Sequence, residues 1–413
     1  MSPGARGAPA DRAPALHRHC EFKRGTAAVD TGRNVRSADA ARCPHRLRVA
    51  LDLPKYRMTA TVTTPSTRDT SLDVMRLIGL LMIILAHVDP PEWLRQLRNF
   101  GTPLLIVASA ATYAVIYDRR AIDVPSFYQK RLTRLVIPVW TFLSIFFGSM
   151  LVVAALSDRS FPFTARQVFE TFTFGKGIGY VWIFPVYMAL AVITPVGLRL
   201  AKHPLRDGPY ALLLLGGAIV YELLRPVLVS RLGDTSRLAL LAISVLPYGL
   251  LYLYGLRLTR FAPSTLAIAA ALAAAVFAWQ GVIEWQRAGD FVPTQTHRFP
   301  PTAYYLSYAF YWINLIALAC RGVKAMTPHT ESVIRWTSAN SMWIYLWHVA
   351  ALFAWNYARM PVRLQSLGAW TCVVSLAAVL LIAVTTTALQ RRVVTRWSTA
   401  GTRTARLIRL TLA

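Results

Sequence analysis

The chain has 413 residues, of which 55% are hydrophobic and only 15% are charged, and its mean hydropathy is +0.42. This composition excludes an ordinary soluble enzyme and indicates a membrane protein with many spans. The formal net charge of +26 does not indicate nucleic-acid binding, because Lys and Arg stand between apolar runs and in the tails. The four cysteines lack CxxC or metal-ligand spacing, which excludes a disulfide framework and a zinc site.

Residues 1–65 are rich in Ala, Arg, Pro and Gly and poor in aromatic residues. Such a segment buries too little apolar surface to fold, so we expect a disordered, basic, cytoplasmic tail. No apolar core of signal-peptide length occurs in residues 1–57, and the first apolar run is therefore expected to remain as a helix. Two alternatives for this tail are an organelle transit peptide and a true start at Met58.

Apolar segments of bilayer-spanning length follow the tail. We place ten of them near residues 72–89, 99–117, 134–156, 180–200, 209–229, 237–257, 262–285, 302–321, 338–358 and 367–389. The predicted fold class is all-α, a polytopic integral membrane protein with about ten transmembrane helices in one domain over residues 66–392. A basic cytoplasmic tail is expected over residues 393–413, and the loop at 157–179 has room for a short re-entrant or interfacial helix.

Basic residues alternate between the predicted loops. The more basic set comprises residues 118–134, 199–207, 257–260, 320–335 and 390–410, and the less basic set includes residues 89–99 and 286–301. Because basic loops remain in the cytoplasm, this alternation predicts an even number of spans in the inner or cytoplasmic membrane, with both termini cytoplasmic.

The first apolar segment, "SLDVMRLIGLLMIILAHVDPPEW", carries Arg76 and His87 with ten uncharged residues between them. Ionisable groups at membrane depth are costly and usually functional. On a continuous helix the two residues would share one face, about 16 Å apart along the axis. Arginine grips phosphate or carboxylate, and neutral imidazole takes up a proton near pH 7. The alternative is that Arg76 is a positive-inside anchor and His87 an interfacial histidine.

Three stretches resemble membrane-bound acyltransferase family 3, which includes O-acyltransferases of surface polysaccharides, Nod factors and macrolides. "LDVMRLIGLLMIILAH" is similar to the family's first helix, in which an LDxxR start precedes a histidine. "FYQKRLTRLVIP" is similar to its RxxR pair, here Arg131 and Arg134, and "SMWIYLWHV" to its late helix, which places Tyr345 and His348. The resemblance covers about residues 70–390. One departure is "VASAATYAV", which stands where the family commonly has an SGFL-type turn.

The resemblance implies that a cytoplasmic acyl-CoA, with acetyl-CoA expected, donates its acyl group to a hydroxyl of an extracytoplasmic carbohydrate or glycolipid. It implies no permanently bound cofactor and no metal. His87 and Arg76 are then the catalytic candidates, while Arg131, Arg134 and Asp73 are expected to bind the donor. His87 would act either as a general base on the acceptor or through a transient acyl-histidine.

Five further residues are candidates for the pore or the acceptor site: Glu222, His297, Arg298, Tyr345 and His348. Glu222 could instead pair with Arg225 as a structural contact, His348 could be a packing residue, and the loop that carries His297 could simply be solvated. The rival function is a secondary transporter of a small solute or lipid-linked sugar, but the sequence has no clear internal repeat and few buried carboxylates. A catalytically inactive scaffold is the third possibility. The lipid bilayer is the expected environment, and no motif indicates an oligomeric state.

Overall fold

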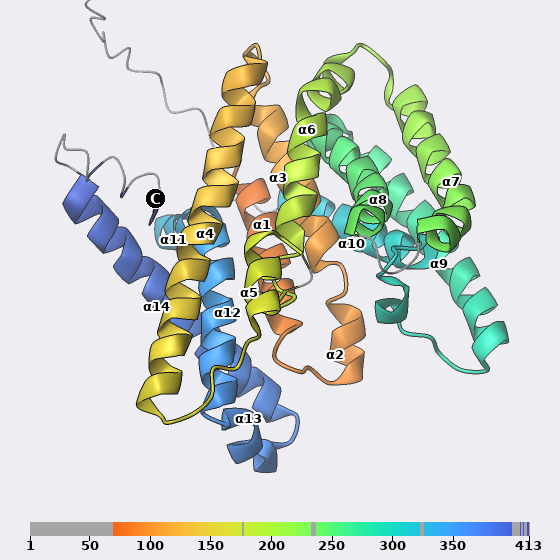
Figure 1. Ribbon diagram of the computed structural model, residues 1–413. Coiled ribbons are helices and arrows are strands. Elements are labelled where there is room, and N and C mark those ends of the chain that lie inside the picture. Colours follow the sequence, from red (N-terminus) through yellow and green to blue (C-terminus); the bar gives the residue numbers. More distant parts are fainter. Residues whose placement is uncertain are drawn as a thin grey trace, which may run out of the picture. The chain divides into compact units, whose positions relative to one another are not determined.

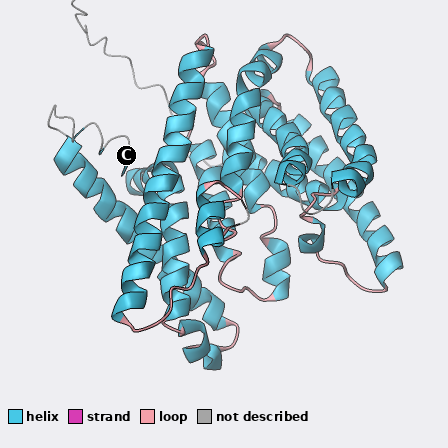
Figure 2. Ribbon diagram, viewed as in Figure 1, coloured by secondary structure: helices cyan, strands magenta, loops and turns pink. Residues whose placement is uncertain are grey.

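The computed structural model describes residues 69–175, 177–232, 237–322 and 326–398, with residues 405, 408, 411 and 412 beyond them. These ranges are mostly helical, and their only β pairing is an isolated bridge between Arg298 and Pro301 (Figure 2). The all-α prediction is confirmed. The expected tail at residues 1–65, including Met58, lies outside the described residues, as does most of 399–413.

The α-helices are α1 (Thr70–Leu85), α2 (Glu92–Leu97), α3 (Gly101–Ile116), α4 (Val124–Leu156), α5 (Ala165–Phe172), α6 (Ile183–Lys202), α7 (Asp207–Leu232), α8 (Arg237–Arg257), α9 (Pro263–Ala288), α10 (Ala303–Gly322), α11 (Pro328–Ala339), α12 (Ser341–Tyr357), α13 (Met360–Arg363) and α14 (Trp370–Ser398). Short 3₁₀ helices are η1 (Leu258–Arg260), η2 (Thr294–His297) and η3 (Gln365–Leu367). The expected short helix in the 157–179 loop is α5, and α14 continues past residue 393.

Each of the ten predicted apolar ranges contains a helix. Seven helices of the described chain are long and apolar enough to cross a bilayer, which makes this a multi-pass membrane protein. Helix α1 is shorter: its 16 residues measure about 24 Å, against about 30 Å of hydrocarbon. The number of ten spans therefore stays a prediction.

Helix α3 packs against α1 and against α8 in the interior (Figure 1). A Cβ atom added at Gly101 of α3 would lie 2.8 Å from the Cβ of Met82 and 3.1 Å from the carbonyl oxygen of Gly79, both on α1. On the other side of α3, a Cβ at Gly255 of α8 would lie 2.6 Å from the carbonyl oxygen of Val107. Small residues allow this close approach of backbones, as is usual between membrane helices.

Apolar side chains on α7, α9 and α14 remain largely exposed, and Figure 1 shows these helices at the edges of the bundle. Exposed examples are Leu212, Leu223, Leu272 and Leu381. A bilayer would cover such surfaces, because lipid chains are as apolar as leucine. The helices at the edges thus face lipid.

Both ends of α1 are determined by local sequence. Asp69 caps its beginning by accepting a hydrogen bond from the backbone N–H of Ser71 at 3.0 Å. After Leu85 the chain reads Ala-His-Val-Asp-Pro-Pro, and Asp89 has a left-handed φ of 48°. A proline disfavours the helical conformation of the residue before it, which here is Asp89, and α1 therefore ends early. This ending puts His87 in a turn within the bundle.

Candidate active site

His87 lies just beyond α1 and not on its regular face. Its backbone N–H donates to the carbonyl of Ile84 at 3.0 Å, a tight turn that follows the last helical residue, Leu85. The expectation that 72–89 is one continuous helix is therefore wrong at its end, because Asp89 and the prolines after it stop the helix. The turn directs the imidazole of His87 toward α12.

His87 and His348 form a direct contact between their rings. Nδ1 of His87 lies 3.1 Å from Nε2 of His348, and the two rings are stacked at 5.3 Å between centroids. His348 is in the middle of α12, is fully buried, and its Nδ1 bonds to the carbonyl of Tyr345 one turn earlier. A chain of three groups, the Tyr345 carbonyl, His348 and His87, thus leads from the helix backbone into the bundle.

The carbonyl at the start of this chain determines the tautomers. A carbonyl oxygen only accepts hydrogen bonds, so Nδ1 of His348 must carry its proton. In neutral His348 the other nitrogen, Nε2, then accepts from Nδ1–H of His87. Neutral His87 consequently keeps an unprotonated Nε2, which is the nitrogen that a general base requires.

Two tyrosines complete the wall around the histidines. The ring of Tyr180 lies edge-on to His87 at 5.0 Å, and its backbone carbonyl accepts the hydroxyl proton of Tyr345 at 2.6 Å. The ring of Tyr345 lies 4.8 Å from that of His348. These contacts fix the loop before α6 against α12 and restrict the orientation of the imidazole of His87.

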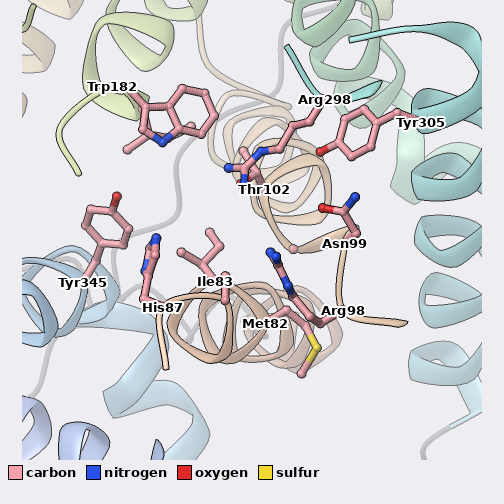
Figure 3. A pocket seen from close by; sticks show the side chains of 13 residues that line it. Met82, Ile83, His87, Arg98, Asn99, Thr102, Trp182, Arg298, Tyr305 and Tyr345 are labelled. Atoms are coloured by element: carbon pink, nitrogen blue, oxygen red, sulfur yellow. The ribbon is translucent and has the colours of Figure 1, made fainter. Parts of the chain in front are cut away.

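A first cavity of about 20 Å³ opens on one side of His87 (Figure 3). Arg98 and Arg298 extend into it from opposite sides, and their positive charges act on His87. Its other polar or aromatic lining residues are Asn99, Thr102, Trp182, Tyr305 and Tyr345. The base therefore lies in a strongly cationic space.

A second, larger cavity of about 240 Å³ lies on the other side of His87. It is formed by the end of α1, by α12 and by the segment from α13 to the start of α14. Its lining combines the aromatic side chain of Trp355 with the polar side chains of Asn356, Thr371 and Ser375. His87 is thus the residue that the two cavities share.

A second cluster of arginines surrounds Tyr113, nearer the beginning of α1. The guanidinium of Arg131 lies over the Tyr113 ring at 4.9 Å, and its Nε has no hydrogen-bond partner among the described residues. The charges of Arg76 and Arg134 also act on Tyr113. Three predicted residues from α1 and α4 are therefore brought together at a position distinct from His87.

A family model described as an acyltransferase domain matches residues 69–388, most of the chain. The chain belongs to acyltransferase family 3. No curated protein and no solved structure matches it. Within this acyltransferase the matched region includes both arginine clusters and both histidines.

Other predicted residues of the acyltransferase lie elsewhere. Asp73 is buried and accepts the hydroxyl proton of Ser338 on α11 at 2.6 Å, which links α1 to α11. Glu222 pairs with Arg225 at 2.7 Å, as the structural alternative states. His297 lies 3.6 Å from Glu284 and does not line either cavity described above, whereas its neighbour Arg298 lines the first one.

The sequence did not single out five polar or aromatic residues that line the first cavity: Arg98, Asn99, Thr102, Trp182 and Tyr305. Arg98 and Asn99 belong to "DPPEWLRQLRN", which the alternation of charge assigns only to an outer loop. The signal that could have indicated them is an arginine next to the apolar start of α3. In the fold, Asn99 donates to the Thr294 hydroxyl at 2.8 Å and so joins this loop to η2.

Proposed function

We propose that this family member is an integral membrane O-acyltransferase that moves an acyl group from cytoplasmic acyl-CoA to a hydroxyl of an extracytoplasmic carbohydrate or glycolipid. The observation that carries the proposal is the contact of 3.1 Å between His87 and His348, next to the two cavities that His87 lines. This contact supplies an oriented base beside a cavity of about 240 Å³, which has room for a substrate. Acyl-CoA is a co-substrate in this scheme, and acetyl-CoA is the first donor to test.

In the proposed step, Nε2 of His87 takes the proton of the acceptor hydroxyl while the hydroxyl oxygen attacks the carbonyl carbon of the thioester. A carbon–oxygen bond forms, the carbon–sulfur bond breaks, and CoA leaves as a thiolate that takes up the proton. His348 acts as a positioning residue, because it accepts from Nδ1–H of His87 in the neutral form and holds the ring in place. A positioned base of this kind is usually worth 10²–10⁴ in rate.

The donor is proposed to bind at the arginine cluster around Tyr113. CoA carries several phosphate charges, and guanidinium groups form strong, charge-assisted hydrogen bonds with phosphate. Arg131 suits this role because its Nε faces no protein acceptor in the described chain. Arg76 and Arg134 add positive charge at the same place. The pantetheine arm would then extend along α1 toward His87, and from Arg76 to the last helical residue, Leu85, this helix rises by about 14 Å.

The acceptor is proposed to occupy the larger cavity. A sugar ring has one apolar face and a rim of hydroxyls, so an aromatic ring flanked by polar groups suits it. Trp355, Asn356 and Thr371 supply that combination in a space of about 240 Å³. Because the cavity begins at His87, a hydroxyl of the bound sugar can reach the base.

The proposal is tested by mass spectrometry of envelope glycans and glycolipids from a deletion strain. We expect the mass of one acyl substituent, with acetyl examined first, to disappear from the glycans or glycolipids. It should return when the wild-type gene is reintroduced, but not when the gene for His87→Ala is introduced. Unchanged acylation together with altered uptake of a small solute would favour the transporter and refute the acyltransferase. Chemical quenching during turnover, followed by a search for acyl-His87, distinguishes the general-base route from the covalent one.

A further inference from the structure

Arg98 and Arg298 place two positive charges in the lining of the first cavity, and this lining includes no carboxylate. Figure 3 shows both side chains directed toward the space between Thr102, Asn99 and His87. The ion pairs within the described chain include neither arginine. The cavity is therefore cationic in the absence of a ligand.

Arg98 is only 5% exposed, yet it has few hydrogen-bond partners in the described protein. Its terminal NH2 group donates to Oε1 of Gln295 at 3.3 Å, which is a weak contact to a neutral group. Its Nε is buried and has no hydrogen-bond partner among the described residues. A buried guanidinium normally bonds to a carboxylate or to several oxygens, so most of its donors remain available to a ligand.

Arg298 is fixed by stacking rather than by hydrogen bonds. Its guanidinium lies 5.2 Å from the ring centroid of Trp182 and 5.0 Å from that of Phe299. Such cation–π contacts hold the plane of the group while leaving the N–H groups at its edge. The Nε of Arg298 is buried and, among the residues described, finds no acceptor.

Two adjacent guanidinium groups repel each other, and burial adds the cost of removing them from water. An anion that accepts from both removes the repulsion and supplies the missing acceptors. The first cavity, of about 20 Å³, has room for one small group but not for a nucleotide. The group that fits there is therefore a compact anion, such as the carboxylate or phosphate group of a larger molecule.

We infer that Arg98 and Arg298 form a subsite for a carboxylate or phosphate group of the acceptor, which makes this acyltransferase specific for anionic glycans or glycolipids. The inference rests on the proposed function. The acceptor is favoured over the donor because His87, which borders this cavity, also borders the larger one, where the rest of the acceptor fits. The proposed donor cluster lies near the beginning of α1, about 14 Å along the helix from its last residue, Leu85.

The test measures binding of inorganic phosphate and of acetate to the purified full-length protein, by calorimetry and without acyl-CoA. We expect wild type to bind at least one of them, and the tighter of the two identifies the group. Arg298→Gln should weaken this binding at least about tenfold, because the charge and the charge-assisted bonds are lost. Arg298→Lys keeps the charge without the planar fork and should give an intermediate affinity.

The matched control is Arg95→Gln on α2, since Arg95 is half-buried, lines neither cavity and makes its ion pair with Glu92 at 3.6 Å. It should bind both anions as wild type does. Equal anion binding by Arg298→Gln and wild type would overturn the subsite, as would a wild type that binds neither anion. Loss of CoA affinity in Arg298→Gln would also overturn it, because the donor's phosphates would then occupy the cavity. A protein that binds phosphate through Arg298 but transfers no acyl group would refute the proposed function and not the anion site.

Discussion

His87 and His348 are 261 positions apart in the chain, and the fold brings Nδ1 of the first to 3.1 Å from Nε2 of the second. The contact joins the turn after α1 to the middle of α12. The backbone carbonyl of Tyr345 accepts from Nδ1–H of His348 and thereby determines which nitrogen of each imidazole carries the proton. His87 is therefore oriented from the backbone of another helix. The two histidines should accordingly respond differently to substitution.

His87→Ala is expected to lower turnover by about 10²-fold or more while leaving CoA affinity nearly unchanged, because it removes the base and no donor contact. Acyl transfer and CoA binding are measured on the purified protein in lipid nanodiscs. His329→Ala is the matched control, since His329 is an exposed histidine on α11 and should leave both quantities unchanged.

Substitutions at His348 separate positioning from simple packing. His348→Gln keeps an oxygen that accepts from Nδ1–H of His87, whereas His348→Phe fills the space without an acceptor. We expect His348→Phe to reduce kcat at least about tenfold with an unchanged donor KM, and His348→Gln to recover a large part of it. Thermal unfolding of both variants shows whether each is folded. Equal kcat values for folded Gln and Phe variants would mean that the hydrogen bond has no role.

The helices were largely predictable, because apolar runs and their interruptions are local features of the sequence. The end of α1 was not, although its cause is also local: the effect of Asp89 and the following prolines reaches back to Leu85. The prediction that His87 shares a helical face with Arg76 assumed that the helix continues to residue 87. Periodicity describes a face only while the helix continues.

Only part of the site was predictable from the sequence. The residues that were identified carry a signal in the sequence that Arg98, which was missed, does not carry. His87 was identified because an ionisable group at membrane depth is costly. His348 was identified through the resemblance of "SMWIYLWHV" to the family's late helix, and Arg298 as a charged residue of an outer loop. Arg98 was missed because one more arginine in an outer loop is explained by topology alone. Its side chain contacts Gln295, which is 197 positions away in the chain, and no local pattern predicts such a contact.

Gly101→Ala is expected to destabilise the protein by about 1–3 kcal/mol, because the new methyl group overlaps Met82 at 2.8 Å between α3 and α1. Activity should fall as well, since Gly101 also lines the first cavity. The midpoint of thermal unfolding in detergent measures the change. Gly148→Ala on α4 is the control, because its added methyl group meets nothing within 4 Å. If the two variants unfold at the same temperature, the close approach of α1 and α3 does not limit stability.

The predicted topology is tested by reporter fusions after Arg134 and after Arg392. Both should report a cytoplasmic position, because each follows or lies within a basic stretch. A fusion after Asp290, in the less basic set, should report the opposite side. A periplasmic signal after Arg134 would reverse the sides assigned to donor and acceptor.

The last prediction separates the arginine cluster near the start of α1 from the base beyond its end. Arg131→Ala is expected to raise the donor KM and weaken CoA binding about tenfold or more, because a charge-assisted contact to phosphate is lost. Its effect on kcat at saturating donor should be small, which is the reverse of His87→Ala. Arg119→Ala is the matched control, since Arg119 is an exposed arginine of the loop before α4.

Arg76→Ala decides between the two interpretations of the first apolar segment. If Arg76 binds the donor, the variant should resemble Arg131→Ala, because both charges act on Tyr113. If Arg76 is only a topological anchor, CoA affinity should stay at the wild-type value. A folded Arg131→Ala protein with wild-type CoA affinity would falsify the proposed donor site. The site depends on Arg131, because its guanidinium contacts the Tyr113 ring and its buried Nε has no hydrogen-bond acceptor among the described residues.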